Sequence, residues 1–434
     1  MTKKILICLI VVFSSIASAQ QGTSSPYSFY GIGSLKFKGT AENRAMGGIS
    51  VYSDSIHVNL KNPASYAGSN FSFYNNEARP VKFAIGTSFS STTLKTASDS
   101  DDSGTSSVDY LAVVLPLQKF GVGFGIMPYT NVGYKLQSKD DEGTLQNRYR
   151  GEGGVNRVFL GLGYQLLESL KVGLDAQYNF GNISNTSIAF GYNDQGDLLQ
   201  YQSRLSKRSD LSGFSFNLGM VYQKSLGNRL ELMAAASYSP KANLNSTNQS
   251  DLATISIDVN GQEYTINTIA NNLEDQNLLE TTMTLPAKTT FGIGIGRPLK
   301  WFVGLDYTFL EASNFSNRFI NVDNTTFENA SSLSLGGFFI PKYDSFSNYW
   351  KRIVFRAGVR YEQTGLVVNN ESIKEFGISF GVGVPVGRLF SNANVALEFG
   401  QRGTTASELV QENFFNLNIS LSLNDRWFEK RKFN

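Results

Sequence analysis

The stretch Gly121-Val-Gly-Phe-Gly-Ile-Met-Pro128 carries the pattern that decides the fold. Side chains of a β-strand point alternately to its two faces, so the three glycines share one face and Val122, Phe124 and Ile126 share the other. Bulky apolar residues on one face and small ones on the other are typical of a strand whose outer face meets lipid. Pro128 lacks a backbone N–H and therefore interrupts the hydrogen-bond ladder where this stretch ends.

The composition favours strands over helices. The 434 residues include 41 Gly, 32 Phe and 20 Tyr, whereas charged residues make up only 17%, and glycine with aromatics is the mixture found in β-rich proteins. The one cysteine is Cys8, so neither a disulfide nor a thiol nucleophile is expected in a processed chain. Basic and acidic residues nearly balance, which gives no reason to expect a nucleic-acid partner.

The beginning of the chain predicts export. Lys3 and Lys4 precede an apolar run over residues 5–13, and Ala17-Ser-Ala19 forms a small-residue cleavage site. These features predict a secretory signal peptide over residues 1–19. No run of eighteen apolar residues follows, so we expect no transmembrane helix. An exported chain can still cross the outer membrane as a closed barrel, because closure leaves no backbone group unpaired.

Alternating runs recur from residue 71 onward. Their extents are 71–91, 106–116, 119–136, 148–166, 170–184, 211–224, 229–239, 283–296, 300–311, 328–340, 352–362, 373–385, 392–402 and 413–424. The chain is therefore predicted to be all-β, with a transmembrane antiparallel β-barrel of about fourteen strands over residues 71–426.

A soluble β-sandwich would also alternate, with its apolar face turned inward. Two features favour the membrane barrel: most runs reach about ten residues, and tight turns alternate with long polar loops. An even number of strands places both chain ends on the short-turn, periplasmic side of a Gram-negative outer membrane, together with a tail at 427–434. The longest loop, 240–282, is expected to fold over the outer mouth.

Residues 20–70 differ from the rest of the chain. They contain short turn-rich pieces without sustained alternation, and a segment of this size is too small to form its own core. We therefore expect an N-terminal plug, or hatch, folded inside the barrel lumen.

Catalytic and metal chemistry are not expected. The only histidine, His57, lies in the plug segment, so no strand offers a general base beside a nucleophile. Without a histidine pair or a cysteine in the processed chain, neither a metal nor another cofactor is predicted. Charged residues on inward faces are instead expected to form ion pairs in the lumen that hold the plug. These residues are Asp175, Asp306, Arg356, Arg360 and Glu398.

Several short motifs carry a resemblance to a known family. Asn62-Pro-Ala64, Pro128 in the third strand and Leu285-Pro-Ala287 at the start of the eighth, on about fourteen strands, resemble the FadL-type family. These proteins are outer-membrane transporters of long-chain fatty acids and aromatic hydrocarbons. The segments Gly400–Thr405 and Ser422–Phe428 more closely resemble FadL-like proteins of Bacteroidetes.

The resemblance implies a mechanism in which outer loops capture a hydrophobic molecule. The molecule enters an apolar pocket above the hatch and leaves sideways into the bilayer where the third strand kinks. Hatch residues would be Arg44, Gly47, Gly48, Asn62, Pro63 and Ala64, and kink residues would be Gly125, Met127, Pro128 and Tyr129. Strand position alone assigns the kink. The alternative is that Pro128 lies past the membrane band, where a missing hydrogen bond is harmless.

Two functions follow from these patterns. The first is an outer-membrane channel for passive uptake of hydrophobic small molecules, with release into outer-membrane lipid. The second is a non-transporting subunit or docking platform of a secretion or assembly complex, with other outer-membrane proteins as partners. A channel should have a continuous apolar cavity above the hatch, lined by residues such as Phe302, Leu310 and Phe338. A platform should have a lumen filled by polar contacts and an exposed apolar patch.

Overall fold

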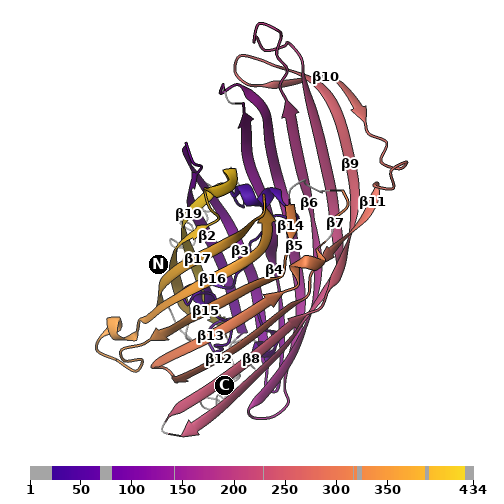
Figure 1. Cartoon of the computed structure of the whole chain (residues 1–434). Coiled ribbons are helices and arrows are strands. Elements are labelled where there is room, and N and C mark those ends of the chain that lie inside the picture. Colours follow the sequence, from indigo (N-terminus) through magenta and orange to yellow (C-terminus); the bar gives the residue numbers. More distant parts are fainter. Residues whose placement is uncertain are drawn as a thin grey trace, which may run out of the picture.

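Antiparallel pairing joins the last wall strand to the first. The computed structural model describes residues 22–68, 81–140, 142–227, 229–315, 317–319, 325–386 and 391–425. Within these residues β19 (Gln411–Asp425) pairs along its whole length with β2 (Val81–Lys95), which closes the sheet into a barrel (Figure 1). None of the helices in the described part of the chain is long and apolar enough to span a membrane.

The described residues form fourteen wall strands, which confirms the predicted fold class. In chain order the wall consists of β2, β3 (Ser100–Leu117), β4 (Phe120–Lys139), β5 (Leu145–Gln165), β6 (Leu170–Ala189), β7 (Gln202–Gly227), β8 with β9 (Leu230–Ser239, Ala242–Ile257), β11 with β12 (Glu280–Leu285, Lys288–Arg297), β13 (Trp301–Leu310), β15 (Ala330–Phe339), β16 (Val354–Val368), β17 (Glu371–Pro385), β18 (Asn392–Arg402) and β19. The two composite strands break at Pro240 and Pro286, which cannot donate to the ladder.

Smaller elements lie beside the wall. They are β1 (Ser34–Leu35), β10 (Glu263–Ala270), β14 (Thr325–Phe327), the helical turn α2 (Ala41–Arg44) and the 3-10 turns η1 (Pro26–Phe29), η2 (Pro63–Tyr66), η4 (Ala312–Asn314), η5 (Tyr349–Arg352) and η6 (Ala406–Glu408).

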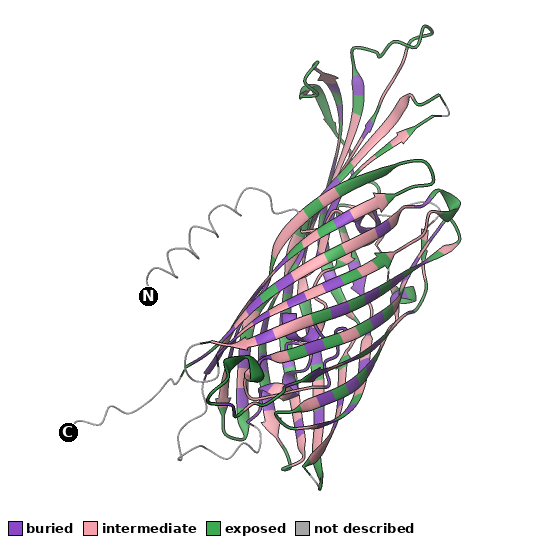
Figure 2. Cartoon of the chain, turned by 90° about the vertical axis from the view of Figure 1, so that its left-hand side faces the viewer, coloured by how far each residue is buried: buried purple, intermediate pink, exposed green. Residues whose placement is uncertain are grey.

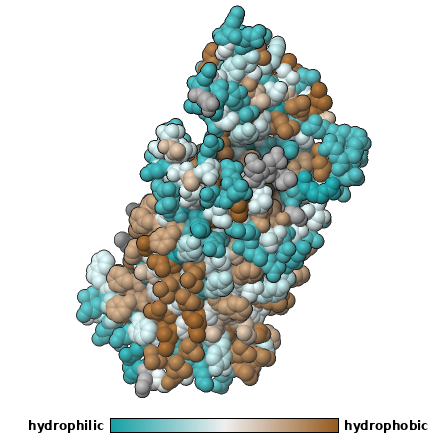
Figure 3. All heavy atoms as spheres, viewed as in Figure 1, coloured by the Kyte–Doolittle hydropathy of each residue, from teal (hydrophilic) through white to brown (hydrophobic). Residues whose placement is uncertain are grey.

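The two faces of the wall differ as the alternation predicts. Phe124 and Leu174 keep 42% of their surface exposed on the outside, whereas Asp175 and Asn418 keep 1% on the inside. Burial therefore alternates along the strands, and apolar residues gather over the lower part of the outer face (Figures 2 and 3). A soluble sandwich would show the opposite arrangement, with its large apolar residues in a dry centre.

Short turns gather at one end of the barrel, as expected, but the opposite end differs from the prediction. Much of the polar sequence predicted as long loops continues as strand. The prediction that 240–282 folds over the mouth is wrong, because β9 pairs with β7 and β10 pairs with β9. These strands extend the wall upward on one side (Figure 1). Alternating small polar residues such as Asn243, Asn245 and Thr247 pair well in such a ladder.

Some predicted features fall outside the described residues. These are the signal peptide at 1–19, the beginning of the first strand at 71–80 and the tail at 427–434. The last described residue, Asp425, ends β19 at the short-turn end. Gly22, the first described residue, lies instead against Asn131, well along β4 from that end.

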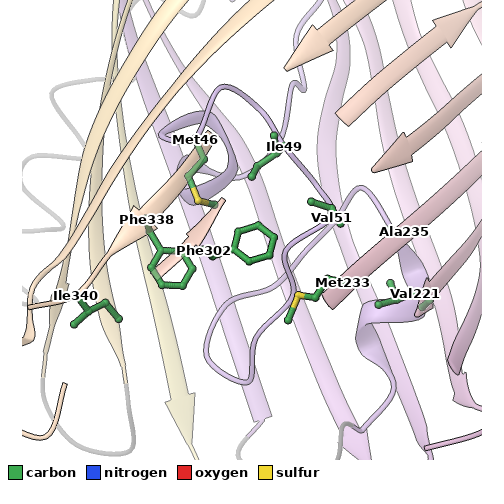
Figure 4. Packing of buried hydrophobic residues seen from close by; sticks show 10 residues of the cluster. Met46, Ile49, Val51, Val221, Met233, Ala235, Phe302, Phe338 and Ile340 are labelled. Atoms are coloured by element: carbon green, nitrogen blue, oxygen red, sulfur yellow. The ribbon is translucent and has the colours of Figure 1, made fainter. Parts of the chain in front are cut away.

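Residues 22–68 pack against the inner side of the wall. Met46 and Val51 share an apolar cluster with Phe302 of β13, and Tyr66 shares another with Phe159 of β5 (Figure 4). Wall residues complete both clusters, so the segment needs no core of its own. The segment therefore obtains its burial from the barrel, as its small size demands.

Inward-facing glycines of the wall make room for this segment. A Cβ atom on Gly121 would lie 1.8 Å from the Tyr66 carbonyl oxygen, and one on Gly336 would lie 2.1 Å from the Met46 carbonyl oxygen. Both distances are far below contact distance, so even alanine would displace backbone. The alternating glycines in the sequence therefore leave the space in which the segment lies directly on the wall.

We expect Gly336→Ala to lower the free energy of unfolding by about 1–3 kcal/mol, the usual cost of overpacking. The measurement is equilibrium urea unfolding of the protein refolded into lipid vesicles, together with limited proteolysis of the N-terminal segment. The matched control is Gly104→Ala, because a Cβ there meets only the Ser90 carbonyl oxygen at 3.9 Å. Equal stability of the two variants would contradict this account of the glycines.

Candidate functional site

A cluster of buried charges joins the N-terminal segment to one side of the wall. We call it the lumen ion cluster. Its members are Lys38, Arg44, Arg360, Glu362, Glu375, Glu398 and Arg402. Lys38 Nζ lies 2.6 Å from Glu375 Oε1, and Arg44 Nη2 lies 2.8 Å from Glu398 Oε2. Both links run from the segment to strands β17 and β18.

The wall supplies the rest of the cluster. Arg360 on β16 contacts Glu375 and reaches Glu398 at 2.7 Å, while Arg402 on β18 holds the second oxygen of Glu375. Glu375 is thereby shared by three cations although it is only 2% exposed. Buried charges persist only when they are paired and hydrogen-bonded in this way.

The five charged residues predicted for the lumen all face inward, but they do not form one network. Arg360 and Glu398 belong to the lumen ion cluster, whereas Arg356 donates to Asn394 Oδ1 at 3.0 Å. Asp306 accepts from the Ser50 hydroxyl at 2.7 Å, and Asp175 accepts from Asn217 at 3.4 Å. Their partners lie on different sides of the barrel.

Sequence reasoning missed the centre of the cluster. Glu375 alternates with Phe376, which is 47% exposed on the outer face, and Arg402 has the same parity as Glu398. The period of two therefore predicts that both side chains point inward. Their pairing with Lys38 could not be found in this way, because Lys38 lies in a segment without any periodicity.

The helical turn α2 adds a second anchor. The buried Glu42 carboxylate accepts hydrogen bonds from Asn394 Nδ2 at 2.7 Å and from the hydroxyl of Ser420 at 2.9 Å. Burial alone would raise the pKa of Glu42, but His57, Arg356 and a hydrogen bond from Thr40 hold that pKa below its ordinary value. Glu42 is accordingly an anion that ties α2 to β18 and β19.

The residues predicted for the hatch contact the wall at two places. Asn62 Nδ2 donates to the Met220 carbonyl at 3.0 Å and to the Ala236 carbonyl at 3.1 Å, while its Oδ1 caps η2. Pro63 and Ala64 follow in η2 and lie against Gly173.

Arg44, Gly47 and Gly48 form the other contact. Arg44 binds Glu398, and the Gly47 N–H donates to the Ser379 hydroxyl at 2.8 Å. Gly47 and Gly48 have φ values of +68° and +89°, a conformation that side chains disfavour.

The wall is interrupted between β3 and β4. These strands pair only from Leu117↔Phe120 to Leu111↔Ile126. Beyond Ile126, β4 pairs instead with β1, where Ser34 lies opposite Asn131. In the described part of the chain the remainder of β3 pairs with β2 alone.

Of the residues predicted for the kink, Met127, Pro128 and Tyr129 lie at this interruption, whereas Gly125 is still paired with Ala112 of β3. Pro128 pairs with Asn156 of β5, and the following residue, Tyr129, is bulged out of the ladder. The Arg157 guanidinium lies 3.9 Å from the centre of the Tyr129 ring. A cavity of about 540 Å³ occupies the gap, and Met127 and Pro128 line it together with Gly22, Val108, Leu111, Ile126 and Asn156.

Phe302, Phe338 and Leu310 do not line one cavity above the hatch. Phe302 and Phe338 lie near the short-turn end, where Tyr52 packs at ring distances of 4.9 Å and 4.8 Å. Leu310 ends β13 at the opposite end, opposite Ala330. Strand position explains the difference, because eight residues separate Phe302 from Leu310 along a nearly straight strand.

The single histidine pairs with an aspartate of its own segment. His57 Nδ1 lies 2.7 Å from Asp54 Oδ2, a pair within the N-terminal segment. Burial would raise the pKa of Asp54, but His57 and Lys82 together hold that pKa well below its usual range. Among the described residues no group of three or more His, Cys, Asp or Glu side chains could hold a metal ion.

Fold and site together define an outer-membrane β-barrel of the FadL-like architecture. The Pseudomonas putida toluene transporter TodX matches with a TM-score of 0.56 and 17% identity, over 89% of this chain and 98% of that one. The Ralstonia pickettii toluene transporter TbuX matches with a TM-score of 0.55 and 16% identity, over 89% and 98%. A Pseudomonas aeruginosa FadL homologue matches with a TM-score of 0.56 and 11% identity, over 92% and 100%.

The sequence gives a narrower assignment. The family model described as BamG matches residues 1–434, so the chain belongs to the BamG family. No curated protein matches the chain in sequence. At these low identities the solved structures bear on the fold alone.

We expect Glu375→Gln to loosen the N-terminal segment, because the neutral amide leaves the buried Arg360 and the partly buried Lys38 and Arg402 short of one negative charge. Breaking a buried pair in this way costs about 3–5 kcal/mol. The measurement is ion conductance of the protein in planar bilayers, which should rise above that of the wild type. Glu263→Gln is the control, since Glu263 pairs with Arg150 and Arg204 outside the lumen. An unchanged conductance in Glu375→Gln would show that the cluster does not seal the lumen.

Proposed function

We propose that this chain is a plugged barrel that serves as a subunit or docking platform for other outer-membrane proteins. The observation that carries the proposal is the anchoring of residues 22–68 on opposite sides of the wall. Lys38 and Arg44 bind β17 and β18, whereas Asn62 binds β7 and β8. Releasing a segment that buried polar contacts hold on both sides costs free energy, because those polar groups lose their partners.

The family points in the same direction. The name BamG suggests other outer-membrane proteins as partners more than a transported molecule. On the C-terminal motifs we also place the chain in a Bacteroidetes-like branch. The short-turn end would face the periplasm, with Asp425, the last described residue, on that side.

The upper extension offers a face for such a partner. Leu205, Leu252 and Ile269 lie opposite one another across β7, β9 and β10, with Leu252 43% exposed and Ile269 60% exposed. Within the described residues β10 pairs on one side only, with β9. An edge strand with an apolar row is a typical template for an added strand of another protein.

We expect Ile266→Asp combined with Ile269→Asp to abolish co-purification of other outer-membrane proteins with the tagged chain. Both side chains are more than half exposed on β10, so the charges should disrupt a partner contact without unfolding the barrel. The measurement is affinity purification from gently solubilised membranes followed by mass spectrometry. Val259→Asp at the fully exposed hairpin tip is the control. If the wild-type chain purifies without stoichiometric partners, the proposal is wrong.

The second candidate is passive uptake of a hydrophobic compound with lateral release into the bilayer. The interrupted β3–β4 pairing and its cavity favour this candidate, because a gap in the wall gives an apolar molecule a sideways exit. The molecule would pass between Pro128 and the N-terminal segment, above the contacts of Asn62, Pro63 and Ala64.

If the chain transports, Asn156→Trp should reduce uptake of toluene into vesicles severalfold, since an indole at this position fills the gap beside Pro128. Uptake is measured with radiolabelled toluene on vesicles that contain equal amounts of folded protein. Gln165→Trp, at the short-turn end of the same strand, is the control. Vesicles with wild-type protein that take up no more toluene than empty vesicles would exclude this candidate.

A further inference from the structure

A second cavity, at the short-turn end, belongs to neither proposed function. It has a volume of about 190 Å³ and lies between the N-terminal segment and strands β7, β8, β12, β13, β15 and β16. A cavity of about 150 Å³ holds a benzene ring, so this one has room for a single ring with a short substituent.

The inner wall of this cavity is aromatic. Tyr52, Phe302 and Phe338 pack around one another with centroid separations between 4.8 Å and 6.2 Å, and Met46 and Met233 complete the lining. Figure 4 shows these phenylalanines and methionines directed toward a common space. Ring edges and thioether sulfurs favour an aromatic body over a polar one.

The mouth of the cavity is cationic. Arg297 and Arg352 line it, and neither has an ion pair among the described residues; the Arg352 guanidinium rests 5.0 Å from the centre of the Tyr349 ring. An adjoining pocket at the same rim adds Arg229, Lys300 and Lys342. Three carboxylates also line the cavity, and each has a partner: Glu231 accepts from Gln223 at 2.6 Å, Glu42 accepts from Asn394, and Asp54 lies against His57. Asp344 lines the adjoining pocket.

His57 also lines this cavity, and one of its ring nitrogens is buried. His57 Nδ1 is held by Asp54, whereas Nε2 is buried and makes no hydrogen bond in the described part of the chain.

We propose that this cavity is a binding site for an aromatic carboxylate, with the ring among Tyr52, Phe302 and Phe338 and the carboxylate toward Arg297 and Arg352. Such a group occurs in free aromatic acids and at the end of a peptide that terminates in an aromatic residue. The site lies at the opposite end of the barrel from β10, so it does not depend on the proposed partner face.

The test is calorimetric titration of 3-phenylpropionate into the full chain in lipid nanodiscs. We expect saturable binding, and we expect Arg297→Gln combined with Arg352→Gln to weaken it about tenfold, as the loss of two partly exposed ion pairs predicts. Arg150→Gln combined with Arg208→Gln is the matched control, because both arginines lie at the far end. 3-Phenylpropanol, which lacks the charge, should bind the wild type about tenfold more weakly than the acid.

Three outcomes would overturn the proposal: no saturable binding, equal binding of acid and alcohol, or no effect of the rim substitutions. A peptide ending in Phe then separates the two sources. If its free-acid form displaces 3-phenylpropionate and its amide does not, the site accepts chain ends. If neither form competes, the site is confined to small free acids, and the aromatic carboxylate assignment is still supported.

Discussion

The structure depends on the close fit between residues 22–68 and the inner face of the wall. That fit exists because the inward positions carry glycine where the segment touches the strands, as Gly121, Gly336 and Gly358 do. Glycine in a strand weakens it, since it brings no side chain to pack and loses more entropy on folding. The segment offsets this loss, because its atoms fill the space that larger side chains would otherwise fill.

Ion pairs between the segment and the wall add to this close fit. Glu375 and Glu398 on the wall would be left with an incomplete set of partners without Lys38 and Arg44 from the segment. A buried carboxylate without a cation strongly destabilises the folded state, whereas a buried ion pair with full hydrogen bonding does so little. The segment lacks a core, and the wall carboxylates take part of their cation partners from the segment, so neither is complete alone. Residues 22–68 are therefore part of the folded barrel rather than a detachable stopper.

How far the sequence predicts this arrangement differs from one region to another. The membrane band was predictable, because lipid outside and a crowded lumen inside impose a period of two on stretches such as Gly121–Ile126. The upper strands were not, because water on the outside requires no continuous apolar face: polar pairs such as Asn245 with Thr282 occur beside apolar pairs such as Leu252 with Ile269. The inward direction of Glu375 follows from parity, but its partner Lys38 comes from a segment without periodicity, and only the fold brings them together.

The same reasoning separates the parts of the segment that can move from those that cannot. Lys38 to Ala64 is tied to the wall by buried charges and glycine contacts on several strands, so its release would expose unpaired ions. Ser34 and Leu35 are held to β4 mainly by strand pairing, at the place where β3 leaves that edge free. In the proposed uptake, the sideways passage would therefore run past a short edge strand, while the contacts of Lys38, Arg44 and Asn62 with the wall stay in place.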